Sequence, residues 1–581
     1  MENGRRVWAR VGSWAAENWP VPLLWFGLWV ARYWHSAGFG LYEDDLTHLP
    51  SAVQMAWPEV GAFISDVILH FRGSGHPLHL VFQYVLGAAG WRLGGLWGLY
   101  LVGYALICLN TFLFFKLVQR IGGTALAGLS GLAYVIYSAD TTQAFLTYSF
   151  GIQTALAMVL LAFHAFVRGR SVLALILSAL AILTYETTFL VLLAAPLLLS
   201  PWDREWRNVA WKYVAGILLI LFADVAVRIV AGDQRVGGLE AGTVLQLPFL
   251  HMLQGPPVAL GTYLYRPIQA LQTLDGEKIG MMAIGFVLVL AAFAVASRLL
   301  GGKGLASVPS DPLANLSPRS RLRAMAGKLP ADIRWLARPA LAGLVMLVLA
   351  YPLTFTVRAY AITGRDTRVH AAGVLGAGLL CGSIMIAGLI LAKRRPLRLG
   401  GIVLIAVWAG MMAGFGLDVQ RDYLRAWQLQ RTFWQGLVPL LPDVTDGTVV
   451  LVDPEVLEDT RQIGANYWNL PRVLGKLYAF PVSWKAVPRT FRMVPGWRDR
   501  VLTQDGKLRL DASTTFSPPS TYGEFDPENA ILIVPGPTGL ARLTEFTAGE
   551  TQSVGLKPAE GVGEPPYPRD FLYTLLIEPP G

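Results

Sequence analysis

Charge and cysteine are both scarce in this chain. Asp, Glu, Lys and Arg make up only 15% of the 581 residues, whereas soluble domains contain about 25%. Hydrophobic residues account for 54%, so the composition is that of a polytopic membrane protein. The two cysteines, Cys108 and Cys381, both lie in apolar stretches. We therefore expect no disulfide framework and no cysteine-based metal cluster.

Several signals of other protein classes are absent as well. No small-residue cleavage site follows the N-terminal apolar run, so we expect it to stay in the membrane and not to be removed as a signal peptide. We find no internal repeat, and Gly536-Pro537-Thr538-Gly539 is too short for a phosphate-binding loop. The net charge is +9, but the basic residues lie mainly between apolar runs. This placement is typical of membrane topology and excludes a nucleic-acid surface.

What the chain has instead is a series of apolar runs long enough to cross a membrane as helices. They lie near residues 19–39, 95–118, 122–138, 146–167, 213–231, 279–297, 339–357, 371–392 and 399–417. A further run, 171–199, is long for one helix and short for two, and Tyr185-Glu186 interrupts it.

The distribution of basic residues decides how often the 171–199 run crosses. If the run turns near Glu186 and the N-terminus is cytoplasmic, all the strongly basic loops lie in the cytoplasm, as the positive-inside rule requires. A single crossing would place the basic 298–338 loop outside. We therefore predict two passes here and about eleven spans in all, in a multi-pass protein of the cell (cytoplasmic) membrane. The N-terminus is expected inside and the C-terminus outside.

This topology predicts two domains. Residues 1–440 form a helical transmembrane domain with two long outer loops, 40–94 and 232–278. Stretches of both loops, 63–70 and 247–253, suit amphipathic helices on the membrane surface. Residues 441–581 form a small extracytoplasmic α/β domain, in which 448–452 and 530–536 have the pattern of buried strands bounded by turn residues.

Three consecutive carboxylates, Glu43, Asp44 and Asp45, follow the first apolar run. Clustered carboxylates repel one another and are costly near hydrocarbon, so the triplet needs a reason. One acidic residue can stabilise a helix N-terminus, but three exceed what capping needs. On the outer surface, a carboxylate can act as general base toward a hydroxyl or help to hold a divalent cation. His48 follows within one helical turn, which would bring it beside Asp44 or Asp45.

Farther along the same loop, glycines flank polar residues just before the chain re-enters the membrane. The segment is Arg72-Gly73-Ser74-Gly75-His76-Pro77-Leu78-His79. Such a segment can cradle an anionic headgroup. A simple interfacial turn fits these residues equally well.

Together, these features resemble the GT-C superfamily of integral-membrane glycosyltransferases, which includes protein O-mannosyltransferases and aminoarabinose transferases. The first outer loop of these enzymes opens with an acidic dyad and later carries a His-Pro-Pro-Leu-like element. The matching residues here are Asp44-Asp45 and His76-Pro77-Leu78, and the broken run at Tyr185-Glu186 and the outer C-terminal domain are also similar. The likeness covers the layout of roughly residues 1–440. Glu43 precedes the acidic pair and one proline stands where two are frequent, which leaves open which carboxylate is the base.

The resemblance implies a sugar donor linked to a polyprenyl phosphate and a glycan, lipid or protein acceptor. Asp44 or Asp45, supported by Glu43, would deprotonate or orient the acceptor hydroxyl. The leaving lipid phosphate then needs positive partners. No cofactor is certain, and the carboxylates leave room for a divalent metal ion.

Three arginines in a short outer loop are the first candidates for these positive partners, because they run against the positive-inside trend and suit bidentate phosphate binding. They are Arg358, Arg365 and Arg368. Their alternative is pairing with Asp366 or with anionic lipid. Arg266 and His76 are further phosphate-binding candidates, and supporting roles are open to His48, His79 and Glu186.

Two further groups are less suited to a chemical role. Asp224 and Arg228, four apart in an apolar run, are expected to form a structural pair within one helix. Asp140 lies in the outer loop after the third span and is a weaker candidate for the same cavity as the acidic triplet.

The main alternative function is a transporter or lipid flippase without glycosyl transfer. Transporters place charged or broken elements near the bilayer midplane and often have repeated halves, which this sequence lacks. A third possibility is a scaffold of the same shape that does not catalyse a reaction and whose C-terminal domain binds a partner.

Overall fold

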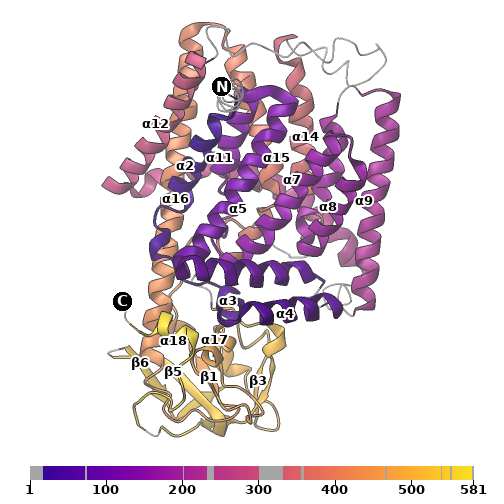
Figure 1. The fold of residues 1–581 in the computed structure, drawn as a ribbon. Coiled ribbons are helices and arrows are strands. Elements are labelled where there is room, and N and C mark those ends of the chain that lie inside the picture. The colour runs from indigo at the N-terminus through magenta and orange to yellow at the C-terminus, as the bar shows by residue number, and fades with distance from the viewer. Residues whose placement is uncertain are drawn as a thin grey trace, which may run out of the picture.

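The computed structural model describes most of the chain. The described residues are 17–71, 75–199, 202–231, 241–299, 331–354, 359–464, 467–537, 539–549, 552–559 and 561–578. They form a helical bundle with a small α/β domain at one end, as Figure 1 shows. Arg358 and the segment 72–74, both singled out above, lie outside the described residues.

Helices occupy every apolar run predicted from the sequence. The principal helices are α2 (Pro20–Arg32), α5 (Pro77–Val135), α7 (Thr154–Val167), α8 (Ser171–Thr184), α9 (Arg204–Val230), α11 (Ala241–Ala270), α12 (Gly276–Leu299), α14 (Ala337–Leu349), α15 (Gly373–Leu391) and α16 (Arg395–Leu437). Within the described part of the chain, six helical segments are long and apolar enough to cross a membrane. The other runs form shorter helices, so the count of about eleven crossings and the orientation of the bundle stay predictions.

The ambiguous run 171–199 is broken where the sequence indicated. Helix α8 ends at Thr184, Tyr185 is extended, and two 3₁₀ segments follow, Glu186–Thr188 and Leu190–Leu198. The Glu186 carboxylate lies 2.7 Å from His76, the N-cap residue of α5. Leu199 accepts a hydrogen bond from Arg338, in the first turn of α14. The break lies where the sequence predicts a turn, and the two crossings of this run stay a prediction.

Helix α5 consists of three helical segments separated by two bends. Gly95 and Gly123 have positive φ angles of 59° and 81°, which a residue with a Cβ rarely adopts, and the helix bends at both. The first segment packs against α3 (Asp45–Gln54) and α4 (Trp57–Leu69); Phe63 of α4 stacks on Tyr84 of α5 at 3.9 Å. Figure 1 shows α3 and α4 lying across the end of the bundle.

Both stretches predicted as surface helices are helical. Residues 63–69 belong to α4, which exposes Ile68 and Leu69, and residues 247–253 belong to α11, which exposes Phe249 and Leu253. Large apolar side chains on an exposed face suit contact with lipid.

The C-terminal domain is built on a four-stranded sheet in the order β2-β1-β5-β6. The strands are β1 (Val449–Val452), β2 (Arg489–Arg492), β5 (Ala530–Gly536) and β6 (Gly539–Leu543). Strand β1 pairs in parallel with β2 and β5, and β6 is antiparallel to β5. All four residues of β1 are buried and apolar, as a central parallel strand requires. Both strands predicted from the sequence are thus present.

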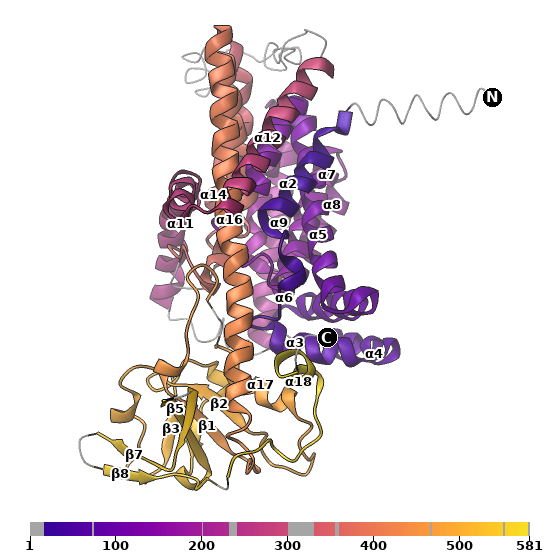
Figure 2. The ribbon, with the colours of Figure 1, turned by 90° about the vertical axis from the view of Figure 1, so that its left-hand side faces the viewer.

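Smaller elements complete this domain. They are α17 (Leu470–Leu477), α18 (Phe571–Leu576) and two antiparallel pairs, β3 (Leu508–Leu510) with β4 (Gly523–Phe525) and β7 (Glu545–Ala548) with β8 (Gln552–Gly555). Helix α16 runs without a break from the bundle into the domain, as Figure 2 shows.

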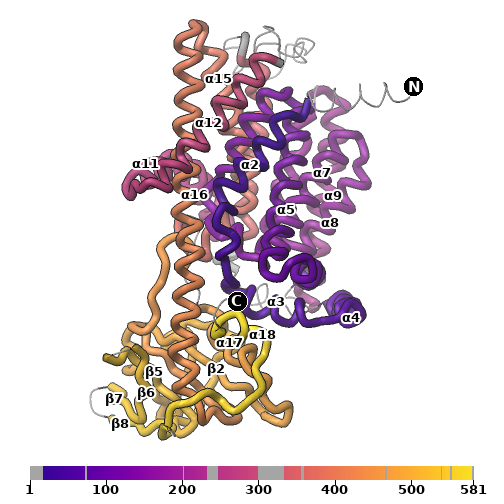
Figure 3. Tube along the Cα trace, turned by 60° about the vertical axis from the view of Figure 1, so that its left-hand side comes forward, coloured from indigo at the N-terminus to yellow at the C-terminus, as the bar shows by residue number. Residues whose placement is uncertain are grey.

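The domain is tied to the end of the bundle by hydrogen bonds between distant segments. Lys476 of α17 donates to Ser51 of α3 at 2.9 Å, and Gln54 donates to Asp570 at 2.7 Å. Figure 3 shows α17 and α18 beside α3. Gln462 accepts from Thr141 at 2.7 Å, which ties the domain to a bundle loop as well. The acidic triplet lies at this junction.

Candidate functional site

The acidic triplet lies in the tight turn between α2 and α3. Glu43 has a φ angle of 52°, in the left-handed region. This conformation costs a residue with a Cβ roughly 1–3 kcal/mol and is concentrated at functional sites. Because the backbone reverses at Glu43, the three carboxylates point into different surroundings and have different partners.

Asp45 is fully buried and accepts four hydrogen bonds. Its donors are the backbone amides of Tyr42, Leu146 and Thr147 at 3.2, 3.1 and 2.7 Å, and the Thr147 hydroxyl at 2.8 Å. The last two residues open helix α6 (Leu146–Tyr148), whose first amides have no partner within the helix. Burial raises the pKa of Asp45 to about 7, against the lowering effect of these donors. Both oxygens are used to join the triplet to the next helix.

Asp44 differs because its side chain is partly exposed. It is the N-cap residue of α3, yet it makes no capping hydrogen bond. Its Oδ1 instead accepts a 2.6 Å hydrogen bond from the side-chain amide of Asn469, in the C-terminal domain. Burial raises the pKa of Asp44, but the positive charges of Arg365 and Arg368 lower it more, so the net pKa lies below its usual value. Asp44 is therefore ionised at neutral pH.

Glu43 is buried beside an arginine. Its Oε2 lies 3.2 Å from Nη1 of Arg365. Burial raises the pKa of Glu43 to about 7, although the Arg365 charge acts in the opposite direction. Glu43 therefore titrates close to neutral pH and changes the charge around Arg365 when it does.

Arg365 and Arg368 reach the triplet from one short 3₁₀ helix, η7 (Arg365–His370). In a 3₁₀ helix, residues three apart lie directly above one another, so Arg365 and Arg368 project from the same face of η7. Arg365 lies over the Trp468 ring, 4.6 Å from its centroid. Arg368 lies over the Tyr148 ring at 4.9 Å and donates to its hydroxyl. Two fork-shaped cations thus stand beside Asp44.

A second cluster of ionisable groups is formed by His76, Glu186, Asp224 and Arg228. His76 Nε2 is 2.7 Å from Glu186, and the guanidinium of Arg228 is 3.2 Å from His76 Nδ1. Arg228 also pairs with Asp224 at 2.8 Å, as expected from their spacing in one helix. The four residues come from three separate segments of the chain. All four are buried.

Tyr185 lies beside two histidines of the first outer loop and α5. Its ring stacks on His76 at 5.9 Å and lies 5.6 Å from His79. His79 Nε2 is 2.6 Å from the amide of Gln83. Both ring nitrogens of His76 thus face protein partners, and neither is directed at the two arginines of η7.

His48 lies one turn into α3, where its backbone amide donates to the Asp44 carbonyl at 3.0 Å. Burial lowers the pKa of His48, although the Asp44 carboxylate raises it. The sequence spacing thus places His48 near Asp44, as a neutral ring at pH 7.

Arg266 is not part of the triplet site. Its guanidinium donates to Gln269 at 2.7 Å, to Gln462 at 3.2 Å and to the Ile362 carbonyl. It also covers the Phe415 ring at 4.3 Å. These contacts hold the segment before η7 against the C-terminal domain.

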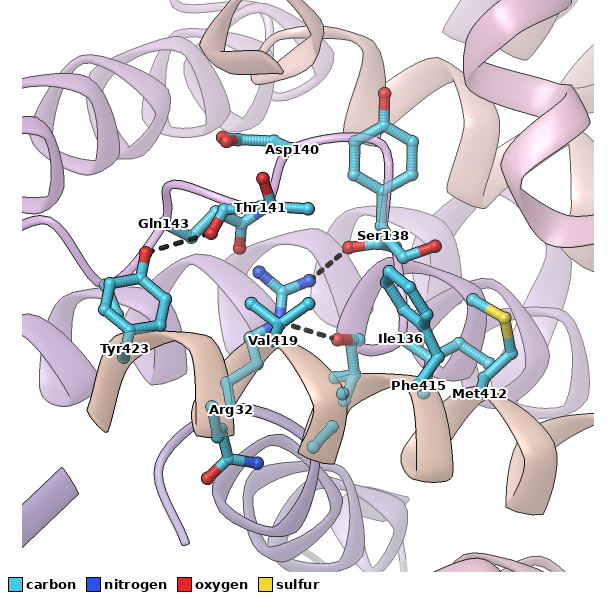
Figure 4. A pocket seen from close by; sticks show the side chains of 16 residues that line it. Arg32, Ile136, Ser138, Asp140, Thr141, Gln143, Met412, Phe415, Val419 and Tyr423 are labelled. Carbon is cyan, nitrogen blue, oxygen red and sulfur yellow. Dashed lines mark hydrogen bonds between the residues drawn. The ribbon is translucent and has the colours of Figure 1, made fainter. Parts of the chain in front are cut away.

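Asp140 lies away from the acidic triplet and lines a small pocket, which Figure 4 shows with Arg32 and Tyr423. Asp140 accepts from the amide and hydroxyl of Thr142 at 2.9 and 2.7 Å. The pocket encloses about 40 Å³, which is room for a water molecule and not for a sugar.

Within the described ranges, no group of three or more His, Cys, Asp or Glu side chains is arranged to hold a metal ion. The carboxylates of the triplet are instead surrounded by hydrogen-bond donors and arginines.

The fold defines a multi-pass helical membrane protein whose soluble α/β domain covers an acidic site at one end of the bundle. No family model matches the chain, and no curated protein matches it. Two solved structures of ArnT from Cupriavidus metallidurans are similar to it. The structure bound to undecaprenyl phosphate has a TM-score of 0.32 and 20% identity, covering 75% of this chain and 83% of that chain. The apo structure has a TM-score of 0.33 and 19% identity, covering 76% and 83%.

A likeness at this TM-score assigns no activity to this chain.

Proposed function

We propose that this protein is a membrane glycosyltransferase that moves a sugar from a polyprenyl-phosphate-linked donor to an acceptor hydroxyl on the extracytoplasmic side. The observation that carries the proposal is the surroundings of Asp44. Asp44 is half-buried, makes no capping bond and lies close to two arginines of η7, whose charges lower its pKa. An open carboxylate next to paired guanidinium groups can serve a hydroxyl nucleophile and a phosphate leaving group at once.

Each of the three carboxylates has a different role in the proposed reaction. Asp44 is the general base, because it combines partial exposure with a negative charge at neutral pH. Asp45 is a positioning residue that fixes the turn to Leu146 and Thr147. Glu43 positions Arg365 through their 3.2 Å pair.

In the reaction, Asp44 accepts a hydrogen bond from the acceptor hydroxyl and takes its proton as the oxygen attacks the anomeric carbon of the donor. The new bond joins that oxygen to the anomeric carbon, and the bond between this carbon and the lipid phosphate oxygen breaks. The lipid phosphate leaves with the electron pair and one additional negative charge. A single displacement of this kind inverts the anomeric configuration.

The departing phosphate is stabilised by Arg365 and Arg368. Arginine forks match phosphate oxygens in pairs, and donors placed where charge develops lower the barrier most. Trp468 and Tyr148 support the two guanidinium planes from below. The arginines thereby serve the leaving group while they keep Asp44 ionised.

The test is Asp44→Asn in full-length protein, purified and assayed with a panel of polyprenyl-phosphate sugars. General-base catalysis is worth about 10²- to 10⁴-fold, and the variant should lose that much of kcat/KM while it keeps the melting temperature of the wild type. The matched control is Asp505→Asn, at an exposed position of the C-terminal domain. Transfer by the Asp44 variant at the wild-type rate would rule out the assigned base.

The second cluster supports a competing function. Buried ionisable groups such as His76, Glu186, Asp224 and Arg228 are typical of the proton and ion pathways of transporters. A transporter would move sugar or lipid across reconstituted vesicles without forming a glycosidic bond. Such movement should survive Asp44→Asn and should be abolished by Glu186→Gln. Glycosyl transfer has the opposite dependence on Asp44.

A further inference from the structure

A cavity of about 400 Å³ lies between η7 and the C-terminal domain. This volume falls within the range of small-molecule sites, about 300–1,000 Å³. Two aromatic rings line one wall: Trp468, which is half-buried, and Phe516, whose side chain is 39% exposed. The two rings meet edge to face at 5.2 Å, so they form a fixed corner with accessible aromatic surface.

The charged groups of the cavity balance. Arg365 and Arg492 line it together with Asp366 and Asp459, so the formal charge is zero. Arg492 lies 3.9 Å from Asp459, and it covers the Phe516 ring at 5.6 Å. A balanced set of donors and acceptors does not favour a polyanion, which would need an excess of cations.

Arg365 and Arg492 each lie over one face of these two aromatic rings, which leaves the opposite faces for a ligand. Aromatic surface beside balanced polar groups favours an uncharged carbohydrate. The face of an aromatic ring is negative, and it attracts the slightly positive C–H groups on one side of a sugar ring. Charged side chains at the edge can then form hydrogen bonds with the hydroxyl groups. A lipid chain would leave these charged groups without partners, which is costly.

The residues that line the cavity are also connected to the acidic triplet. Trp468 precedes Asn469, whose amide donates to Asp44 at 2.6 Å. Arg365 lines the cavity and pairs with Glu43 at 3.2 Å. A ligand that stacks on Trp468 therefore contacts the residue next to Asn469, which is the hydrogen-bond partner of Asp44.

We propose that this cavity is the acceptor site and that the acceptor is a neutral glycan whose sugar ring stacks on Trp468 and Phe516. The inference rests on the proposed glycosyltransferase function and assigns the substrate class of the same site. The C-terminal domain thus selects the acceptor, while the helical bundle carries the donor.

The experiment measures binding without donor, so that it does not depend on transfer. Full-length protein in nanodiscs is titrated with neutral trisaccharides of mannose, glucose, galactose and arabinose, and binding is followed by saturation-transfer NMR. Phe516→Ala should weaken binding about 3- to 10-fold and Trp468→Ala by at least about 10-fold. The matched control is Trp484→Ala, because Trp484 is also a half-buried ring of this domain but stacks on Phe480.

Asp44→Asn keeps a hydrogen-bonding side chain beside the acceptor hydroxyl and leaves both aromatic rings in place, so it should still bind the trisaccharide, although it cannot transfer sugar. If that variant binds and the wild type forms no glycosidic bond, the proposed function fails and the carbohydrate site stands. The proposal is overturned if no trisaccharide binds the wild type. It is also overturned if phosphatidylglycerol in the nanodisc bilayer competes with the trisaccharide for the cavity. It is equally overturned if Phe516→Ala binds as tightly as Trp484→Ala. The exposed Phe516 keeps the test valid should Trp468→Ala fail to fold.

Discussion

The side-chain amide of Asn469 donates a 2.6 Å hydrogen bond to the carboxylate of Asp44, although the two residues lie 425 positions apart. One belongs to the soluble domain and the other to the end of the membrane bundle. The hydrogen bond engages one oxygen of Asp44, Oδ1, and restrains the orientation of the carboxylate. The soluble domain therefore contributes to the geometry of the proposed base and does not only cover it.

Removing this bond should change the pH dependence of the reaction. The Asn469 amide lowers the pKa of Asp44, so Asn469→Ala should raise that pKa and shift the acid limb of the kcat/KM profile to higher pH. A hydrogen bond to a charged group is worth about 1.5–3 kcal/mol, so kcat/KM at the pH optimum should fall about 10- to 100-fold. Asn529→Ala, at an exposed position, is the control. An unchanged acid limb in Asn469→Ala would contradict the prediction.

Replacing Arg365 and Arg368 by lysine should distinguish the effect of their positive charge on catalysis from the effect of the guanidinium shape. Arg365→Lys and Arg368→Lys keep the positive charge but lose the paired donors of the guanidinium. We expect each to raise the donor KM and to lower kcat, with a combined loss in kcat/KM of about 10- to 100-fold, while Asp44 stays ionised. Steady-state kinetics with the lipid-linked donor measures this effect. Arg509→Lys, at an exposed pair with Glu524, should leave both constants unchanged.

Glu43 should make the stability of the protein depend on pH. Its pKa rises from 4.5 in the unfolded chain to about 7 in the folded protein, so the folded state holds the proton more tightly. Its stabilising contribution is complete below pH 4.5 and is lost as the pH rises through about 7. At about 1.4 kcal/mol per pKa unit, the loss amounts to roughly 3 kcal/mol.

Glu43→Gln keeps the neutral shape and should remove this part of the pH dependence. The melting temperature of the wild type should therefore fall more between pH 5 and pH 8 than that of the variant. Asp45 titrates in the same range, so a smaller dependence should persist in Glu43→Gln. Exposed Glu524→Gln serves as control. Equal slopes in the wild type and Glu43→Gln would refute the assignment.

Asp45→Asn should damage the fold more than the chemistry. The asparagine amide would point a donor at the donors of Leu146 or Thr147, and a buried donor without an acceptor costs about 1–3 kcal/mol. We expect a lower melting temperature and poor recovery from the membrane. Thr147→Val, which removes one of the four donors, should have a smaller effect in the same direction. If Asp45→Asn melted like the wild type but transferred no sugar, the roles of the two aspartates would have to be exchanged.

The main elements of the fold follow from the sequence for physical reasons. A membrane demands long apolar helices, and a central parallel strand demands consecutive apolar residues such as 449–452, so both kinds of element are visible locally. The break at Glu186 is visible too, because a carboxylate is costly in hydrocarbon and an apolar run that contains one is expected to turn or to open onto a polar cluster there.

The site is less accessible from the sequence because its contacts span hundreds of residues. The sequence predicts that the acidic triplet, Arg365 and Arg368 matter, and the structure brings these residues together. No local pattern marks Asn469 or Trp468, which belong to an ordinary polar segment. The different surroundings of Asp44 and Asp45 also depend on a turn and on donors about a hundred positions away. Likewise, the spacing of Asp224 and Arg228 predicts their pair but not its link to His76.

The unbroken helix α16 has a mechanical consequence. Its 43 residues extend about 65 Å, whereas the hydrocarbon core of a bilayer is about 30 Å thick. About half of the helix therefore extends beyond the hydrocarbon as a rigid segment that connects the bundle to the α/β domain. The length of this segment determines how far the domain lies from the lipid. The distance between the domain and the lipid surface is therefore set by a rigid helix and not by the thermal motion of a flexible linker.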